Sequence, residues 1–297
     1  VVSSDEELIA APDFVDKIEY RLNNENLSKL DLFLAVGETS DVPLLKNKFN
    51  SFAEDVLVCG NIRLELLKRK YRKLLEKDST LYKKRFGNYI LLLTGFAQIN
   101  KLREKTEIDF IYSRIVNENI DPDSHHIHLV NEQVIMQREI LLQTLKFLNN
   151  FEKNFPKKNL VISPHPNEKI EFWENYIDKK KIKNISINRD RHSSSYPLIN
   201  SSEMVISFNS TSLLETYFLE KTGINLLGKK PRVSEIELLK KVSKVVRSSD
   251  ELCEAIKDLD KTENKKPIHK ELNEIKNFEE NFDSFENILD RFDKLKN

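Results

Sequence analysis

The sequence predicts an α/β protein of two domains, each built on a mostly parallel sheet. Short apolar runs alternate with longer amphipathic stretches along much of the chain, which is the pattern of strands joined by covering helices. Several runs end at a glycine, the usual mark of a strand that passes into a loop. With 297 residues, 39% of them hydrophobic, the chain is long enough for about two domains with cores of their own.

The charge and composition exclude several kinds of protein. Lys plus Arg and Asp plus Glu both number 48, so no overall basic field draws the chain to nucleic acid. Apolar runs such as residues 90–93 are far shorter than the ~18–20 residues of a membrane span. Cys59 and Cys253 form no CxxC pair, which argues against a disulfide framework and a zinc site. We therefore expect a cytoplasmic protein that contacts a membrane at most peripherally, at its inner face.

The first part of the chain predicts one domain. Apolar runs at residues 30–36 and 56–59 have the composition of strands, and each stops at a glycine. The charged stretch from 62 to 82, with its spaced leucines, predicts a helix. Residues 83–88 are a polar link. We place the first domain at residues 1–87.

A second alternating series predicts another domain at residues 88–228. An amphipathic helix is expected at 132–155, where apolar residues recur near i, i+3, i+4 and i+7. The expected strands lie at residues 89–94, 159–163, 185–187, 204–207 and 224–227. Residues 229–297 are expected to be mainly helical, with a weak strand at 242–246, and to complete the fold.

A histidine between two prolines follows one of these strands. In an open parallel sheet, ligands bind beyond the carboxyl ends of the strands, so loops at those ends are the places to search. Pro164 and Pro166 fix the backbone on both sides of His165, which leaves its imidazole little entropy to lose on binding. Such a histidine can donate to a phosphate oxygen or to a leaving group. The alternative is a surface turn that happens to contain a histidine.

A polar turn follows the expected strand at 204–207. Asn209, Ser210, Thr211 and Ser212 stand in a row before a predicted helix, where hydroxyls and the first helical N–H groups form an anion site. The alternative is an ordinary helix cap, with Thr211 or Ser212 capping and Glu215 completing a capping box. Capping needs one hydroxyl rather than four polar residues, so the pattern favours phosphate binding. Glu215 is equally suited to face a ribose.

Three acids follow an apparent strand end near the beginning of the chain. Clustered carboxylates raise one another's pKa, so Glu6 or Glu7, next to Asp5, is a candidate general base. The alternative is a solvated helix start, which is what most acidic runs are.

Other residues contribute less to a site. Gly95 follows the first strand of the second domain, where its backbone is able to approach a ligand. His125, His126 and His128 do not indicate a metal site, because no carboxylate or cysteine stands at a matching helical spacing and the surroundings have the composition of a loop. Trp173 is expected to pack a helix against the sheet.

The order of these motifs resembles that of the bacterial surface carbohydrate biosynthesis family. The resemblance spans most of residues 1–228. The motifs that carry it are Asp5-Glu6-Glu7, Ala35-Val36-Gly37-Glu38, Val58-Cys59-Gly60-Asn61-Ile62-Arg63-Leu64-Glu65-Leu66-Leu67, Tyr89-Ile90-Leu91-Leu92-Leu93-Thr94-Gly95-Phe96, Pro164-His165-Pro166 and the Ser/Thr turn. The resemblance implies a GT-B fold, in which two Rossmann-like domains face a cleft, with an N-terminal, acceptor-side domain that is incomplete here.

The family is similar in motif to transferases that use CMP-activated ulosonic acids such as Kdo or sialic acid. That likeness implies that His165 and Pro166 contact the nucleotide and that Thr211 and Ser212 contact its phosphate. It also implies that Glu6 or Glu7 activates the acceptor hydroxyl. The sequence departs from the pattern where a glycine is expected after the acidic pair and in the turn before Glu215, since leucines stand at both positions.

The resemblance thus implies a metal-independent glycosyltransferase without a separate cofactor. Its partners would be a nucleotide-sugar donor, CMP-linked by preference, and a growing surface polysaccharide or lipopolysaccharide as acceptor. Three alternatives stay open: a UDP-sugar 2-epimerase, a CDP-polyol phosphotransferase of surface-polymer synthesis, and a non-catalytic protein that binds nucleotide-sugars.

Overall fold

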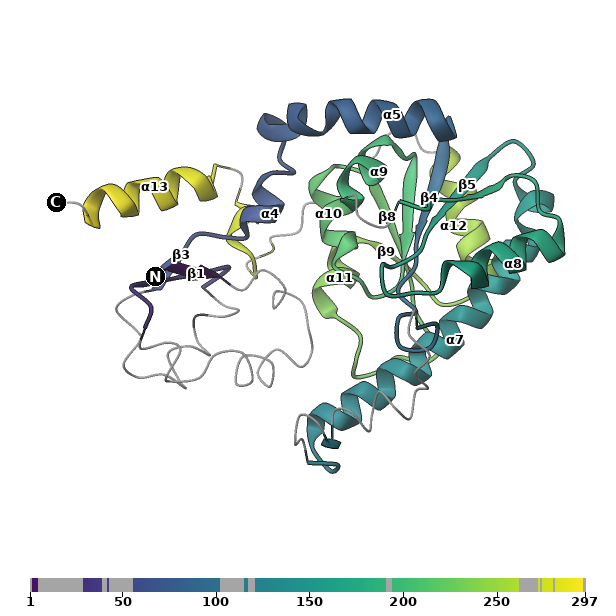
Figure 1. Ribbon diagram of the computed structural model, residues 1–297, viewed down its shortest axis with the longest axis horizontal. Helices are drawn as coiled ribbons and strands as arrows, with labels where there is room; N and C mark the ends of the chain where they lie inside the picture. The colour runs from purple at the N-terminus through teal and green to yellow at the C-terminus, as the bar shows by residue number, and fades with distance from the viewer. Residues whose placement is uncertain are drawn as a thin grey trace. The chain divides into compact units, whose positions relative to one another are not determined.

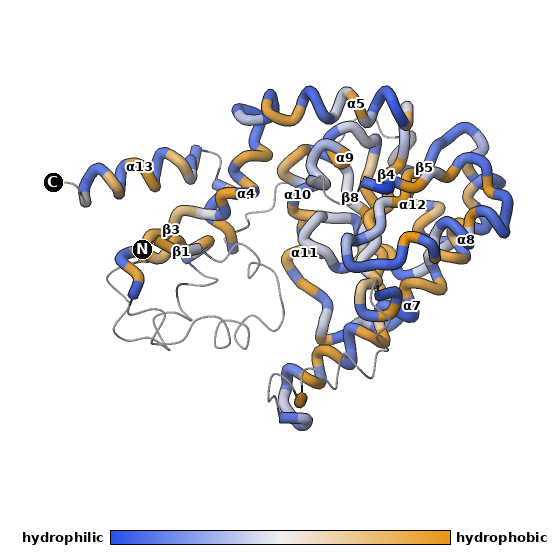
Figure 2. Tube along the Cα trace, in the orientation of Figure 1, coloured by the Kyte–Doolittle hydropathy of each residue, from blue (hydrophilic) through white to orange (hydrophobic). Residues whose placement is uncertain are grey.

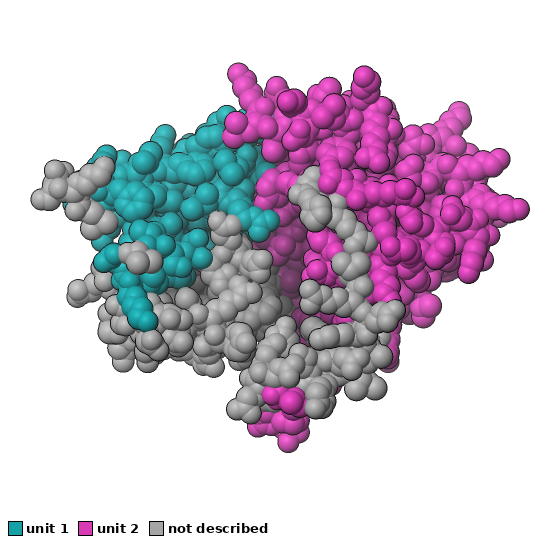
Figure 3. Space-filling model, in the orientation of Figure 1, with its two compact units in different colours: residues 1–72, 269–297 teal, residues 73–268 magenta. Residues whose placement is uncertain are grey.

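A computed structural model shows two compact units (Figure 3). One comprises residues 1–72 with 269–297, and the other comprises residues 73–268. The division differs from the predicted boundary at residue 87, because helix α5 (Glu76–Phe86) belongs to the second unit and the end of the chain belongs to the first. The structure describes residues 2–4, 29–38, 42, 56–101, 115–116, 121–190, 194–261, 272, 274–279 and 281–295.

The second unit is built on a six-stranded, wholly parallel sheet. The strands are β4 (Tyr89–Leu93), β5 (Asn159–Ser163), β6 (Ile185–Ile187), β7 (Met204–Ser207), β8 (Thr222–Leu226) and β9 (Lys244–Val246), in the spatial order β6-β5-β4-β7-β8-β9. All five residues of β4 are buried, as expected for a central strand covered on both faces. The predicted strands of this region are confirmed.

Helices cover both faces of this sheet, as Figure 1 shows. On one side lie α7 (His125–Asn154), α8 (Ile170–Lys180) and α12 (Ser249–Lys261). On the other lie α9 (Ser195–Ser201), α10 (Ser212–Phe218) and α11 (Glu237–Val242). Trp173 of α8 is fully buried in the core between helices and sheet, which confirms its predicted packing role.

Helix α7 is longer than the sequence predicted. Ser124 caps it by accepting a hydrogen bond from the backbone N–H of Ile127 at 3.3 Å, so the three histidines lie in its first turns and not in a loop. Hydrophobic and hydrophilic residues alternate along the helix, as Figure 2 shows, because one side of it faces the core. Within the described ranges, no three potential metal-ligating side chains lie together.

The first unit contains a smaller parallel sheet with the order β1-β2-β3. Its strands are β1 (Val2–Ser4), β2 (Leu32–Ala35) and β3 (Val56–Val58), and α13 (Ser284–Leu295) packs its Ile288 and Phe292 against them. The predicted strands at 30–36 and 56–59 are confirmed. The fold class, α/β with parallel sheets in two units, is confirmed as well.

The single helix predicted at residues 62–82 is wrong. The segment instead forms α4 (Ile62–Glu65), a turn, the 3-10 helix η2 (Arg69–Leu75) and α5. Glu65 is fully buried in the first unit, and the chain passes into the second unit after Arg72. The break at residues 66–68 thus lies within the first unit. No helix in the described ranges is long and apolar enough to cross a bilayer.

Candidate functional site

The strand order of the larger sheet reverses at β4, since β5 lies on one side of it and β7 on the other. In open α/β sheets such a switch point opens a crevice at the carboxyl ends of the strands, and ligands bind there. The loops that follow β4, β5 and β7 carry most of the residues predicted from the sequence: Gly95, His165, Pro166, Asn209, Ser210, Thr211 and Ser212.

Glu168 is a buried side chain that connects two of these loops by hydrogen bonds. It is fully buried, and its Oε1 accepts hydrogen bonds from Thr94 Oγ1 and from the backbone N–H of Phe96, both at 2.8 Å. Its Oε2 accepts a bond from Trp173 Nε1 at 3.1 Å. The backbone N–H of His165 points at the same carboxylate, 3.4 Å from Oε1. Glu168 therefore fixes the loop after β4 and the loop after β5 relative to each other.

Burial raises the pKa of Glu168 above its ordinary value of 4.5, although the hydrogen bonds from Thr94, Phe96 and Trp173 oppose that shift. No sequence motif assigned this residue a role. Its hydrogen-bond partners are scattered along the chain. The sequence therefore indicated a role for Glu168 only through its place, three residues after His165 and just before α8. It positions the loops and is too buried to touch a ligand directly.

His165 is exposed at this edge of the sheet. Its Nδ1 accepts a hydrogen bond from the backbone N–H of Asn167 at 3.1 Å, and its carbonyl accepts one from the N–H of Glu168 at 2.8 Å. An accepting Nδ1 places the proton of a neutral imidazole on Nε2. The geometry thus leaves Nε2–H as the donor that a ligand would meet, and Pro166 is exposed beside it.

The hydroxyls of the second loop form a small cluster. Ser212 Oγ lies 3.0 Å from Ser207 Oγ and 3.1 Å from Ser210 Oγ. Thr211 is exposed at the N-cap position of α10, but its side chain makes no capping hydrogen bond. Glu215 is buried and accepts a bond from Ser195 Oγ at 2.8 Å. Ser210 Oγ accepts a hydrogen bond from the backbone N–H of Ser212 at 3.3 Å, so one hydroxyl of the turn bonds to the start of α10. The contacts among the hydroxyls of Ser207, Ser210 and Ser212 are additional to that bond.

Asn209 shapes this loop. It has a left-handed backbone, with φ of 47°, and its Nδ2 donates to the carbonyl of Ser234 at 2.7 Å. Its Oδ1 accepts a bond from the N–H of Ile236 at 2.8 Å, and its own N–H donates to Asn225 Oδ1 at 2.9 Å. These bonds hold the loops after β7 and β8 together, and the expected contact of Asn209 with a nucleotide stays a prediction.

Gly95 lies where the loop after β4 passes the loop after β7. A Cβ added to Gly95 would meet Phe208 O at 4.0 Å, which is ordinary van der Waals contact. Packing alone therefore does not require a glycine here. We expect Gly95→Ala to change the free energy of unfolding by less than about 1 kcal/mol and, if a nucleotide binds at this edge, to weaken that binding several-fold, because the methyl group keeps the ligand from the backbone. Urea unfolding and calorimetry on the same variant measure both effects.

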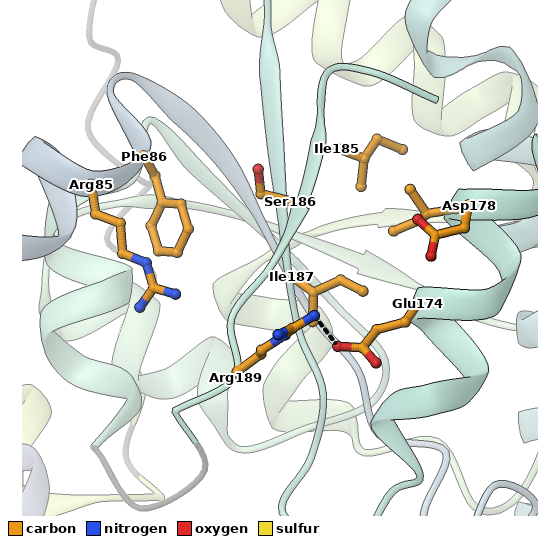
Figure 4. Close-up of a pocket in the computed structure, with 9 residues that line it drawn as sticks. Arg85, Phe86, Glu174, Asp178, Ile185, Ser186, Ile187 and Arg189 are labelled. Carbon is orange, nitrogen blue, oxygen red and sulfur yellow. Dashed lines mark ion pairs between the residues drawn. The ribbon is translucent and has the colours of Figure 1, made fainter. Parts of the chain in front are cut away.

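A pocket of about 450 Å³ lies elsewhere in the unit, beside the edge strand β6 (Figure 4). Ile185 and Ile187 form part of its lining, and Arg189 pairs there with Glu174 at 2.8 Å. None of its lining residues belongs to the loops after β4, β5 or β7. It is therefore distinct from the candidate site at the switch point. Glu6 and Glu7, the candidate general bases, lie outside the described residues.

No protein-family model and no curated protein matches the sequence. Solved structures do match. UDP-GlcNAc 2-epimerase from Methanocaldococcus jannaschii has a TM-score of 0.58 and 16% identity over 99% of this chain and 76% of that one. S. aureus MnaA with UDP gives 0.52 and 15%, over 98% and 66%. The wall teichoic acid polymerase TagF with CDPG gives 0.51 and 13%, over 91% and 59%.

At these identities the likeness concerns the fold, which is of the GT-B type. The chain spans about three fifths of TagF and of the M. jannaschii epimerase in its complex with UDP-GlcNAc and UDP, at 59% and 61% of their lengths. By their names, the M. jannaschii protein is an epimerase and TagF is a polymerase. The structures of the M. jannaschii epimerase and of MnaA hold uridine nucleotides.

Proposed function

We propose that this chain is a glycosyltransferase that takes its sugar from a nucleotide-sugar and passes it to a growing surface glycan. The donor we favour is a CMP-activated ulosonic acid such as Kdo, on the order of the sequence motifs. The observation that carries the proposal is the switch point at β4, where the buried Glu168 holds the His165 loop against the Gly95 loop.

The proposed chemistry uses donors at this edge. His165 Nε2–H and the hydroxyls of Ser210, Thr211 and Ser212 would bind the phosphate oxygens and stabilise the charge that develops as the sugar leaves. Gly95 would let the nucleotide approach the backbone. Because α10 has only seven residues, its dipole adds little, and the hydroxyls and the imidazole supply most of the stabilisation. Glu6 or Glu7 would remove the proton from the acceptor hydroxyl.

The test is nucleotide binding measured by calorimetry with CMP, CDP and UDP. We expect His165→Ala to weaken binding at least about tenfold, as the loss of one charge-assisted hydrogen bond would. The matched control is His128→Ala, which removes an exposed histidine in the first turns of α7. We expect that variant to bind like the wild type. Wild-type protein that binds none of these nucleotides at millimolar concentration would overturn the proposal.

The second candidate is a 2-epimerase, favoured by the TM-score of 0.58 to the M. jannaschii enzyme and by the larger share of that chain covered. The two reactions differ in their need for an acceptor. An epimerase would convert UDP-GlcNAc alone into a rearranged sugar visible by proton NMR. A transferase would leave the donor intact until an acceptor glycan is added, and a CDP-polyol phosphotransferase would leave CMP together with a phosphodiester product.

A further inference from the structure

Three lysine-rich segments lie at the amino ends of neighbouring strands. They are the end of α5 before β4, the end of α7 with the loop that leads to β5, and the end of α8 with the loop that leads to β6. Their basic residues are Lys83, Lys84, Arg85, Lys153, Lys157, Lys158, Lys179, Lys180, Lys181 and Lys183. We call this set the lysine edge. All except Lys158 are exposed.

Hydrogen bonds hold the three segments side by side. Asn184 Nδ2 donates to the carbonyls of Phe155 and Lys158, at 3.1 and 2.9 Å, which ties the two loops together. Asn159 Nδ2 lies 3.3 Å from the carbonyl of Asn88 and joins the start of β5 to the segment after α5. The pocket in Figure 4 spans the same region, with Arg85 on one side of β6 and Asp178 on the other.

The lysine edge is a local imbalance in a chain whose total charge is zero. Residues 83–88, 152–159 and 178–184 contain ten basic side chains against two acids, Glu152 and Asp178. Of the basic residues, Lys158 pairs with Glu203 at 3.1 Å. The rest form no ion pair within the described part of the chain. Like charges brought together in this way repel one another, so an anionic surface would stabilise them.

An exposed leucine adjoins the lysine edge. Leu81 on α5 is 58% exposed, and it shares a helical face with the exposed Lys77 and Lys84, at i−4 and i+3, and with one acid, Asp78, at i−3. Helix α5 runs along the amino edge of the sheet, since its Lys83 and the first residue of β8, Thr222, line one cavity of about 670 Å³. Flexible lysines flanking an apolar side chain suit a lipid surface better than the bases of a nucleic acid, which favour arginine and aromatic side chains.

We propose that the lysine edge docks the protein on a membrane rich in anionic phospholipids, with Leu81 reaching into the headgroup layer. The lysines would interact with lipid phosphates through long-range attraction rather than fixed pairs. The carboxyl edge with His165 lies at the opposite ends of the same strands, so the docked protein keeps its crevice open. The proposed membrane docking does not depend on which reaction takes place at the carboxyl edge.

The test is co-sedimentation of the full chain with vesicles. The probe is phosphatidylcholine mixed with phosphatidylglycerol, compared with phosphatidylcholine alone. Lys157→Gln, Lys180→Gln and Lys183→Gln in one variant should lower the partition coefficient on the order of 100-fold. Binding of the wild type should fall between about 0.1 M and about 1 M salt, because the Debye length shortens from about 10 to about 3 Å.

Two further variants decide what the surface binds. Lys229→Gln and Lys230→Gln remove two exposed lysines that follow the carboxyl end of β8, and this control should partition like the wild type. Leu81→Gln should weaken vesicle binding roughly tenfold. Equal binding to neutral and anionic vesicles would overturn the proposal. So would a nucleic-acid duplex that binds more tightly than vesicles and is lost in the Lys157 triple variant but not in Leu81→Gln. Calorimetry with nucleotides should be unchanged in the triple variant, which separates this proposal from that of the crevice.

Discussion

Glu168→Ala should lower the free energy of unfolding of the second unit by about 3–5 kcal/mol. The substitution leaves the Oγ1 of Thr94, the N–H of Phe96 and the Nε1 of Trp173 buried without the acceptor they now share. The cavity left by the missing carboxylate adds to the loss. Trp173 is the only tryptophan in the sequence, so its fluorescence during a urea titration follows the unfolding of this unit directly.

Glu168→Gln tests the charge separately from the shape. Because burial raises the pKa of Glu168 above 4.5, the folded state holds its proton at pH values where the unfolded state has lost it. Between 4.5 and the raised pKa, the carboxyl therefore stabilises the fold more as the pH falls. The wild type should gain stability relative to Glu168→Gln over that window. The difference should be constant below it and above it.

The control for both variants is Glu171→Gln, an exposed glutamate in the first turn of α8. It should unfold like the wild type at each pH. If the wild type instead loses stability relative to Glu168→Gln as the pH falls through the window, the hydrogen bonds outweigh burial and lower the pKa of Glu168. An unfolding midpoint unchanged in Glu168→Ala would show that the carboxylate does not hold the loops.

The larger sheet was predictable because its signal is local. Strands such as β4 are covered on both faces, so they appear in the sequence as unbroken apolar runs, and each ends at a recognisable loop residue. For the same reason, the positions of His165 and of the Ser/Thr turn at the carboxyl ends of their strands could be predicted from the neighbouring sequence. The hydrogen bonds of Asn209 to Ser234 and Ile236 could not be predicted, because these partners lie far along the chain.

The first unit was harder to predict, because several of its hydrogen bonds join residues that lie far apart in the sequence. Asn61 and Glu65 bond to residues more than two hundred positions later, and no local pattern in a single sequence reveals such a pair. The stretch from 62 to 82 has a helical pattern throughout, yet α4 ends at Glu65, whose buried carboxylate accepts hydrogen bonds from Asn277 and Ser284. Tertiary contacts override helical preference at that point.

Asn277 of the 3-10 helix η4 (Lys276–Phe278) is the centre of this distant contact, and it explains the Gly60-Asn61 motif. Its Oδ1 accepts a bond from the N–H of Asn61, and its Nδ2 donates to Glu65 Oε2 at 2.8 Å. Burial alone would raise the pKa of Glu65, but Lys68, Asn277 and Lys70 hold it below its ordinary value. The carboxylate is thus charged at neutral pH and depends on these partners for its burial.

Gly60→Ala should lower the free energy of unfolding of the first unit by about 3 kcal/mol. Gly60 has a φ of 73°, and an added Cβ would lie 2.5 Å from Asn277 Oδ1, so the methyl group displaces that amide from Asn61 and Glu65. Asn277→Ala alone should cost about 2–3 kcal/mol, since it leaves Glu65 and the N–H of Asn61 short of a partner. Far-UV circular dichroism in urea measures both variants.

The double variant Gly60→Ala/Asn277→Ala separates crowding from backbone strain. Once the amide is gone, the added methyl group meets no obstacle there, and only the strain of the left-handed backbone remains, at about 1–2 kcal/mol. The double variant should therefore be clearly more stable than the sum of the single effects predicts. Strictly additive effects at Gly60 and Asn277 would show that the two residues do not interact.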